Sequence, residues 1–389
     1  MSRRILAVIA AVGLVGPLVL MGCAKRADVA ARNSGVILIG EYDAFHGRTA
    51  DFGKTTHEGI VLAVDEINGK GLLLGKRVVL KSEDDRGEAS EARTAVQKLI
   101  DRDGVVAVLG EVASSNTLTA APVAQSSKIP LITPSSTNPD VTKIGNYIFR
   151  VCFTDDFQGA VCATFARDSL KAARSAIFRD VTSDYSKGFA RAFESTFQKK
   201  GGGIVARSTY TQGDKDFKSQ LTAIRSANPD IIFVPGYYGE VSLIAVQARD
   251  LGIRVPLLGG DGWDSTSLVP AAGTALEGCY FSTHFSSLDT KPEVARFVKA
   301  FRKRYGHDPN ALAALGYDAA WILAEAIRRA GSTQGDAIRR QLAATKDFPG
   351  VTGRITIDSQ RNASKPAVIL QIRGTSFVSV ASITPRQVK

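Results

Sequence analysis

Short apolar runs alternate along the chain with longer segments in which apolar residues recur at helical spacing. In the first half, the runs 36–39, 78–80 and 105–109 predict buried strands of a parallel sheet. Between them, the segments 55–68 and 88–101 each carry their apolar residues on one helical face. Strands that alternate with helices in this way form βαβ units, so the pattern predicts an α/β fold.

The second half of the chain repeats the same order of elements. Predicted strands at 175–178, 204–210 and 231–234 are separated by helical segments at 187–199 and 218–227. The repeat predicts two similar lobes. The pattern then continues with two further helices and a turn-rich β segment, at 292–305, 311–330 and 353–380. Because no Pro/Gly/Ser-rich spacer separates the halves, we expect lobes joined by short crossovers that move as hinged rigid bodies.

The N-terminal segment predicts export from the cytoplasm. Arg3 and Arg4 precede an apolar run over 5–21, which is typical of a signal peptide and short for a membrane-spanning helix. The run ends in Leu-Met-Gly-Cys, which resembles a bacterial lipobox and implies cleavage before Cys23 and lipid on its sulfur. The alternative is an ordinary secretory leader in which Cys23 is incidental.

Composition and charge are ordinary for an exported globular protein. The 389 residues are 44% hydrophobic and 22% charged, which allows a large buried core. Loss of residues 1–22 removes two of the 49 basic residues and none of the 38 acidic ones, which leaves a net charge of +9. Lys and Arg are spread along the predicted helices and form no single stripe, so we expect solvated faces near an anionic membrane and no nucleic-acid partner.

The cysteines argue against a disulfide framework. With Cys23 assigned to lipid, Cys152, Cys162 and Cys279 remain, an odd number that one chain does not pair completely. A bridge between Cys152 and Cys162 stays open, but each cysteine lies in an apolar run that favours a buried free thiol.

Two hydroxyl-rich loops follow predicted strands of the first half. In open α/β sheets, ligands bind at the carboxyl ends of strands, where helix N-termini favour anions. The loop 110–117 includes Ser114 and Ser115, and the loop 133–139 is rich in Ser and Thr and stiffened by two prolines. Together the two loops are suited to cradle a carboxylate. The alternative for Ser114 and Ser115 is that they only cap a helix.

Two loops of the second half offer aromatic rings and one carboxylate. The loop 235–240 contains Tyr237, and the loop 259–263 contains Asp261 among glycines. No basic residue lies within six positions of Asp261, so we expect its carboxylate to have no protein cation as partner and to suit an ammonium group. The alternative is that Asp261 is a turn residue.

The order and spacing of these motifs from 36 to 380 resemble the branched-chain amino acid ABC transporter substrate-binding proteins, the Leu/Ile/Val-binding protein family. Singly each motif is weak, but together they are specific. They comprise Ala63-Val64-Asp65-Glu66-Ile67-Asn68, Asp84-Asp85, Ser114-Ser115, Pro134-Ser135-Ser136-Thr137, Phe157-Gln158-Gly159, Asp184-Tyr185-Ser186-Lys187-Gly188 and Gly316-Tyr317-Asp318-Ala319.

The resemblance implies a type I periplasmic binding protein with two Rossmann-like lobes joined by three crossovers. We expect the first lobe to hold 36–155 with 284–350, and the second lobe to hold 156–283 with 351–380. The remaining segments are the signal peptide 1–22, a tether 23–35 and a tail 381–389.

The resemblance also implies which side chains would hold the ligand. Ser114, Ser135 and Thr137 would bind the α-carboxylate of an amino acid, while Tyr237 and Asp261 would hold its α-ammonium. Tyr185 and Phe52 would line the pocket, with ordinary packing between the lobes as their alternative. Well-known amino-acid binders of the family have glutamate at the position of Asp261, so the ligand is not fixed by the resemblance.

The implied role is that of an extracytoplasmic binding protein that delivers an amino acid to the permease subunits of an ABC importer. We expect a monomer at the periplasmic face, held to the membrane through acylated Cys23, without a cofactor or catalytic activity. The four histidines have no metal-ligand spacing, and the sequence has neither a nucleophile elbow nor a dinucleotide-binding glycine motif. The alternatives are a ligand-sensing receptor, or an importer component for an amide, a urea or an aromatic acid.

Overall fold

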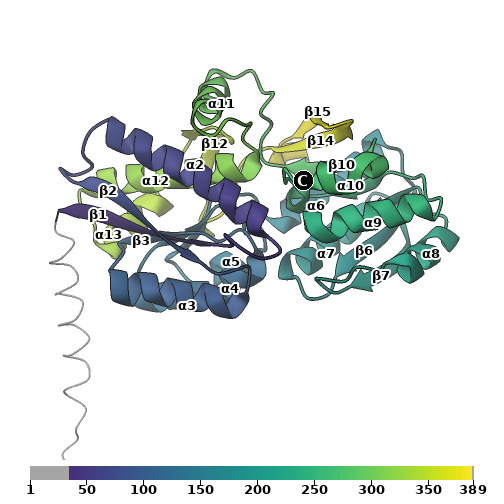
Figure 1. Cartoon of the computed structure of the whole chain (residues 1–389), viewed down its shortest axis with the longest axis horizontal. Coiled ribbons are helices and arrows are strands. Elements are labelled where there is room, and N and C mark those ends of the chain that lie inside the picture. Colours follow the sequence, from purple (N-terminus) through teal and green to yellow (C-terminus); the bar gives the residue numbers. More distant parts are fainter. Residues whose placement is uncertain (1–34, 388–389) are drawn as a thin grey trace, which may run out of the picture.

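The first lobe is a five-stranded parallel sheet between two layers of helices. The computed structural model describes residues 35–387, and the first lobe lies on the left in Figure 1. Its strand order is β2-β1-β3-β4-β5, with all neighbours parallel. The strands are β1 Val36–Asp43, β2 Arg77–Asp84, β3 Ala107–Leu109, β4 Leu131–Thr133 and β5 Ile148–Arg150.

Alternate residues of β1 face the two helix layers. Ile37 and Ile39 pack with α2, α12 and α13, whereas Leu38 faces the cluster formed by α3 and α4. This alternation buries both faces of the sheet, as expected for parallel strands. The helices of this lobe are α2 Ala50–Gly69, α3 Ala89–Lys98, η1 Leu99–Asp103, α4 Ser114–Ser127, α5 Asp140–Lys143, α11 Pro292–Tyr305, α12 Ala311–Ala330 and α13 Gly335–Ala343.

The second lobe repeats the topology of the first and adds an antiparallel hairpin. Its strand order is β15-β14-β10-β9-β8-β6-β7, in which the part from β7 to β10 is parallel and β14 and β15 are antiparallel. The strands are β6 Arg174–Asp180, β7 Gly203–Tyr210, β8 Ile231–Phe233, β9 Leu257–Gly259, β10 Tyr280–Thr283, β14 Ala367–Arg373 and β15 Ser376–Ile383.

Helices cover this sheet as well, on the right in Figure 1. The helices are α6 Asp155–Thr164, η2 Phe165–Ser169, α7 Asp184–Lys199, α8 Lys218–Ser226, α9 Tyr238–Asp250, η3 Asp261–Trp263, α10 Leu268–Ala272, η4 Gly273–Leu276 and the terminal turn η5 Pro385–Gln387. The predicted α/β class and the two similar lobes are therefore confirmed.

The elements follow the hydrophobic pattern closely where helices are long. The helices predicted at 292–305 and 311–330 have those bounds in the structure. The strand predicted at 105–109 is shorter, because the Val105 N–H donates to the carbonyl of Leu99 in the preceding helix at 3.3 Å. The apolar run therefore includes a helix-to-strand turn as well as the strand.

Motif glycines permit close contact between helices in both lobes. A Cβ atom at Gly316 would lie 2.5 Å from the carbonyl oxygen of Thr56, which brings α12 against α2. A Cβ atom at Gly159 would lie 2.6 Å from the backbone nitrogen of Phe193, which brings α6 against α7. The two glycines noted in the sequence motifs thus set the spacing of one helix pair in each lobe.

The chain crosses between the lobes three times. Cys152 packs in the core of the first lobe and Phe153 in that of the second, and Phe285 returns the chain to the first lobe after β10. For the third crossing, the prediction assigned 351–380 to the second lobe. A small sheet of β11 Phe348–Gly350, β12 Gly353–Ile357 and β13 Ala363–Ser364 packs its buried residues into the first-lobe core.

We therefore propose that the third crossing lies between β13 and β14, where Ala367 joins the core of the second lobe. The strand β15 continues to Ile383, into the segment that was expected as the tail. The signal peptide, most of the tether and Cys23 lie outside the described residues.

Cys152, Cys162 and Cys279 are buried free thiols, in agreement with their apolar sequence context. Burial raises the pKa of both Cys152 and Cys162 to about 12. Between residues 35 and 387, no helix combines the length and apolar character needed to cross a membrane.

Candidate ligand-binding site

The hydroxyl loop after β3 presents Ser114 and Ser115 at the start of α4. Ala113 precedes the helix in extended backbone, and no side chain caps the helix. Ser114 Oγ accepts a hydrogen bond from the Asn138 N–H at 3.2 Å, and Ser115 Oγ accepts one from the Asp184 N–H at 3.0 Å. The alternative that these serines only cap the helix is therefore wrong: they join this loop to its neighbour and to the other lobe.

A buried arginine that sequence reasoning missed holds the second hydroxyl loop in place through hydrogen bonds to its backbone. Arg150 has no exposed surface, and its guanidinium donates to the carbonyls of Ser136 at 2.6 Å and Asn138 at 2.7 Å. Ser136 Oγ in turn donates to the Glu111 carbonyl at 2.8 Å, which ties the two loops together. The available signal was a single arginine inside the apolar segment 147–153.

Thr137 lies in this loop beside the first residue of α6. Its carbonyl accepts a hydrogen bond from the Asp155 N–H at 2.9 Å. Burial raises the pKa of the Asp155 carboxyl well above its usual range; the Thr137 hydroxyl lowers it, and the nearby Asp261 carboxylate raises it. Asp155 thus lies within electrostatic reach of both the first-lobe loop and the second-lobe carboxylate.

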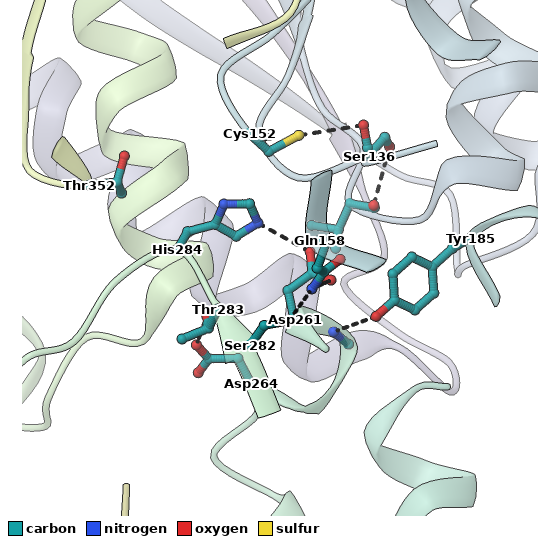
Figure 2. Close-up of polar contacts among 12 residues, drawn as sticks. Ser136, Cys152, Gln158, Tyr185, Asp261, Asp264, Ser282, Thr283, His284 and Thr352 are labelled. Carbon is teal, nitrogen blue, oxygen red and sulfur yellow. Dashed lines mark hydrogen bonds and ion pairs between the residues drawn. The ribbon is translucent and has the colours of Figure 1, made fainter. Parts of the chain in front are cut away.

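Asp261 begins a short 3-10 turn directly after β9 and is almost fully buried. Its Oδ1 accepts a hydrogen bond from Gln158 Nε2 at 2.9 Å, and its Oδ2 lies 3.2 Å from His284 Nε2 (Figure 2). Burial lowers the pKa of His284 to about 4, so the imidazole is neutral at pH 7. In the described chain, both carboxylate oxygens of Asp261 therefore contact neutral side chains.

Gln158 and His284 are residues that sequence reasoning left outside the site. Gln158 belonged to a family motif without a role, and His284 counted as one of four scattered histidines. Gln158 Nε2 also donates to Ser282 Oγ at 2.9 Å, which fixes the orientation of its amide. Spacing along the chain gave no signal, because 103 residues separate Gln158 from Asp261.

Five of the seven predicted ligand contacts surround one small cavity between the lobes, with a volume of about 10 Å³. The other two, Ser114 and Thr137, are buried in the bordering loops and do not line it. The first lobe contributes four lining residues, which are Phe52, Val112, Ser135 and Leu312. The second lobe contributes the other four, which are Tyr185, Tyr237, Asp261 and Gly262.

Three aromatic rings form one wall of this cavity. Tyr185 and Tyr237 stack with ring centroids 5.3 Å apart and an interplanar angle of 4°. Phe52 of the first lobe meets Tyr237 edge-on at 5.5 Å. Tyr185 OH also accepts a hydrogen bond from the Gly262 N–H at 3.2 Å, next to Asp261 (Figure 2). The rings therefore pack the lobes together and line the cavity at the same time.

The two lobes are closed over the cavity. Asp51 at the start of α2 accepts hydrogen bonds from the hydroxyls of Ser265 and Thr266, the latter at 2.9 Å. On another side, Asn138 Nδ2 donates to the Asp184 carbonyl at 2.8 Å. Polar contacts thus bridge the lobes in two places, at the start of α2 and at the start of α7.

Beneath the first-lobe loops lie three buried carboxyl groups, Asp43, Asp85 and Glu111. Burial raises the pKa of Asp85 to about 7. Burial and the neighbouring carboxyls raise the pKa values of Asp43 and Glu111 as well. Between about pH 4 and pH 7 the folded state therefore binds more protons than the unfolded state, and stability falls as the pH rises through this window.

We expect Asp85→Asn to stabilise the protein by about 1 to 3 kcal/mol at pH 8 and to leave its stability unchanged near pH 4. The reason is that asparagine keeps an oxygen to accept the Gly87 N–H, bound at 2.8 Å, and carries no charge to be desolvated. Urea unfolding at pH 4, 6 and 8 measures the effect, with the exposed Asp347→Asn as control. A gain in the free energy of unfolding that is equal at all three pH values would contradict the raised pKa of Asp85.

The protein has two α/β lobes closed over a cavity, with hydroxyl loops on one side and a carboxylate on the other. This arrangement defines a two-lobed solute-binding protein. Comparison with known proteins agrees with this class. The pattern of the periplasmic binding protein family matches residues 36–376. The chain belongs to the periplasmic binding protein family.

Individual relatives cover nearly the whole chain. The Leu/Ile/Val-binding protein BraC3 of Rhizobium johnstonii is 33% identical over 322 residues, which are 82% of this chain and 87% of that protein. The leucine-binding protein LivK of Thermotoga maritima superposes with a TM-score of 0.87 at 40% identity, over 90% of this chain and 99% of that one. LivJ of Streptococcus pneumoniae, solved with isoleucine, gives a TM-score of 0.85 at 34% identity, over 90% and 100%.

Proposed function

We propose that this protein binds an α-amino acid with a branched or other aliphatic side chain and delivers it to the permease subunits of an ABC importer. The observation that carries the proposal is the opposition of groups around one cavity. Ser135 and the buried hydroxyl loops lie on the first-lobe side, and Asp261 lies on the second-lobe side. A zwitterion has a carboxylate for the first and an ammonium for the second.

The roles follow from the position of each group. From the loop that borders the cavity, Ser114 would donate its hydroxyl proton to a ligand carboxylate, since its Oγ only accepts from the Asn138 N–H, and main chain near Ser135 would add a donor. Thr137 would contribute from the border of the cavity. Tyr237 and Asp261 would hold the ammonium.

The apolar part of the cavity favours an aliphatic ligand. Phe52, Val112 and Leu312 line it from the first lobe, and the stacked ring of Tyr185 closes it from the second. Such a surface binds hydrocarbon and leaves no buried polar group of the side-chain pocket unpaired. The relatives named for leucine, isoleucine and valine support the same choice.

We also propose that Cys23 carries the lipid and that the segment up to β1 tethers the binding domain to the periplasmic face of a membrane. The lipobox-like sequence before Cys23 supports this proposal. More than one acyl chain on this residue would give stable attachment. The proposal assigns the chain a binding role and no catalytic step.

The expected result of a ligand panel is stabilisation by leucine, isoleucine or valine and none by acetamide, urea or benzoate. A ligand at 100 times its Kd stabilises the folded state by about 2.7 kcal/mol, which a thermal shift assay detects. Leucinamide, without a carboxylate, and 2-hydroxy-4-methylpentanoate, without an ammonium, are matched controls that should bind far more weakly. Stabilisation by benzoate or urea and by no amino acid would overturn the proposal.

A further inference from the structure

His284 occupies an unusual place for a buried histidine. It is the first residue after β10 and lies on the second crossing between the lobes, next to Phe285 in the first-lobe core. Its side chain has no exposed surface, and its Nε2 lies 3.2 Å from Asp261 Oδ2 (Figure 2). A residue of the crossing therefore contacts the carboxylate that the proposed function assigns to the ligand ammonium.

The ring of His284 also connects two crossings. It stacks on Phe153 with centroids 3.7 Å apart and an interplanar angle of 24°. Phe153 belongs to the first crossing, directly after Cys152. The stack joins these two segments, and the contact to Asp261 extends the connection into the cavity.

The neighbours of the imidazole determine which of its two nitrogens carries the proton. Nδ1 has no hydrogen-bond partner among residues 35–387, while Nε2 faces a carboxylate oxygen that only accepts. The Nε2–H tautomer is therefore the one that satisfies the contact. Burial and the Lys365 ammonium lower the pKa of His284, and the Asp261 contact raises it, which leaves the ring neutral at pH 7.

Neutral donors orient a carboxylate without cancelling its charge. Gln158 holds Oδ1 of Asp261 and His284 holds Oδ2, so the carboxylate plane is fixed and its charge is left for a ligand. A buried anion of this kind is costly unless a cation reaches it, and the ligand ammonium supplies one.

We propose that His284 is a positioning residue that couples the ligand ammonium to the hinge, and that it selects ligands bearing a positive charge next to the carboxylate. The inference rests on the proposed function. Through Asp261 the ammonium favours the conformation in which the two crossings are stacked, which is the closed arrangement of the lobes. A ligand without the ammonium makes no such contact and gains nothing from closure at this point.

Two variants separate the donor from the ring. His284→Phe keeps a ring for the stack with Phe153 and removes the donor to Asp261. His284→Gln removes the ring and keeps an N–H donor at a similar distance from the backbone. The readout is the ratio of two Kd values from titration calorimetry, for 2-hydroxy-4-methylpentanoate and for leucine. The exposed His46→Gln serves as control, since its side chain is 79% exposed.

The expected result is a ratio that falls about tenfold or more in His284→Phe, which loses the donor to Asp261, through weaker leucine binding. The ratio falls less, by about threefold to tenfold, in His284→Gln, which keeps a donor but loses the stack on Phe153, and it stays within about threefold of the natural protein in His46→Gln. An unchanged ratio in His284→Phe overturns the inference, as does equal weakening of both ligands, which indicates a purely structural histidine. If His284→Phe fails to fold by circular dichroism, His284→Asn takes its place, because its shorter amide does not reach Asp261. Failure of the natural protein to bind any amino acid would overturn the proposed function itself.

Discussion

Asp261→Asn is expected to weaken leucine binding by about 100-fold or more while the protein stays folded. Loss of one member of a buried charge pair costs about 2 to 5 kcal/mol in binding, because the other charge is left buried and unpaired. Asparagine has nearly the same shape as aspartate, and its oxygen still accepts from Gln158. His284 accommodates the new amide by a change of tautomer, since its Nδ1 is unpartnered in the described chain.

Titration calorimetry measures this loss, and urea unfolding checks that stability changes by less than about 1 kcal/mol. Asp261→Ala is a less suitable variant, because it leaves the buried donors of Gln158 and His284 without an acceptor and is expected to destabilise the fold. Asp264→Asn is the matched control: Asp264 is also buried, three residues further along, but its carboxylate accepts from Thr283 at 2.6 Å outside the cavity. Leucine affinity within threefold of the natural protein in Asp261→Asn would remove Asp261 from the site.

Arg150→Met is expected to lower the free energy of unfolding by about 3 to 5 kcal/mol. Methionine fills part of the space but donates to neither carbonyl, so the Ser136 and Asn138 oxygens lose buried partners at 2.6 and 2.7 Å. The nearby Asp155 also loses the positive charge that lowers its pKa. The loop that carries Ser135 and Thr137 would then lose its support.

Urea unfolding monitored by circular dichroism measures this effect, with Arg354→Met as the control. The Arg354 side chain is 67% exposed and pairs with Asp347 at the surface, so its replacement should change stability by less than about 1 kcal/mol. Any Arg150→Met protein that folds should also bind leucine more weakly. A stability within 1 kcal/mol of the natural protein would show that the buried guanidinium does not hold the loop.

The sequence predicted the elements well where local pattern decides them. The bounds of α11 and α12 were correct because each has an apolar face at helical spacing and a clear start and stop. Short strands were less certain. The run 105–109 was assigned to one strand, although its first residue bonds back to the preceding helix through Leu99, since an apolar run does not show where a backbone turn lies.

For a related reason, the third crossing that we propose lies later in the chain than the sequence predicted. The segments 353–357 and 363–364 have β character in the sequence, and nothing in their pattern indicates which lobe they pack against. That choice depends on long-range contacts with the first-lobe core, where Ile355 and Ile357 are buried. Sequence periodicity reports which face is buried and not what buries it.

For the candidate site, loop position was an informative guide. Ser135, Tyr237 and Asp261 each follow a strand, and the carboxyl ends of parallel strands bring such loops to one edge of a sheet. Gln158 and His284 were missed because their contacts to Asp261 span 103 and 23 residues of chain and involve groups common in protein cores.

The sequence by itself determined the α/β class, the repeated lobes and the loops that carry the hydroxyls and the carboxylate, because these depend on alternation of apolar runs and on residue chemistry near each strand end. Only the tertiary structure decided that Phe52 meets Tyr237 across the lobes, that Arg150 supports the hydroxyl loop and that His284 contacts Asp261. These contacts depend on how two sheets, each with its own layers of helices, are brought together by three crossings. That geometry is set by packing over the whole molecule, and no local stretch of sequence encodes it.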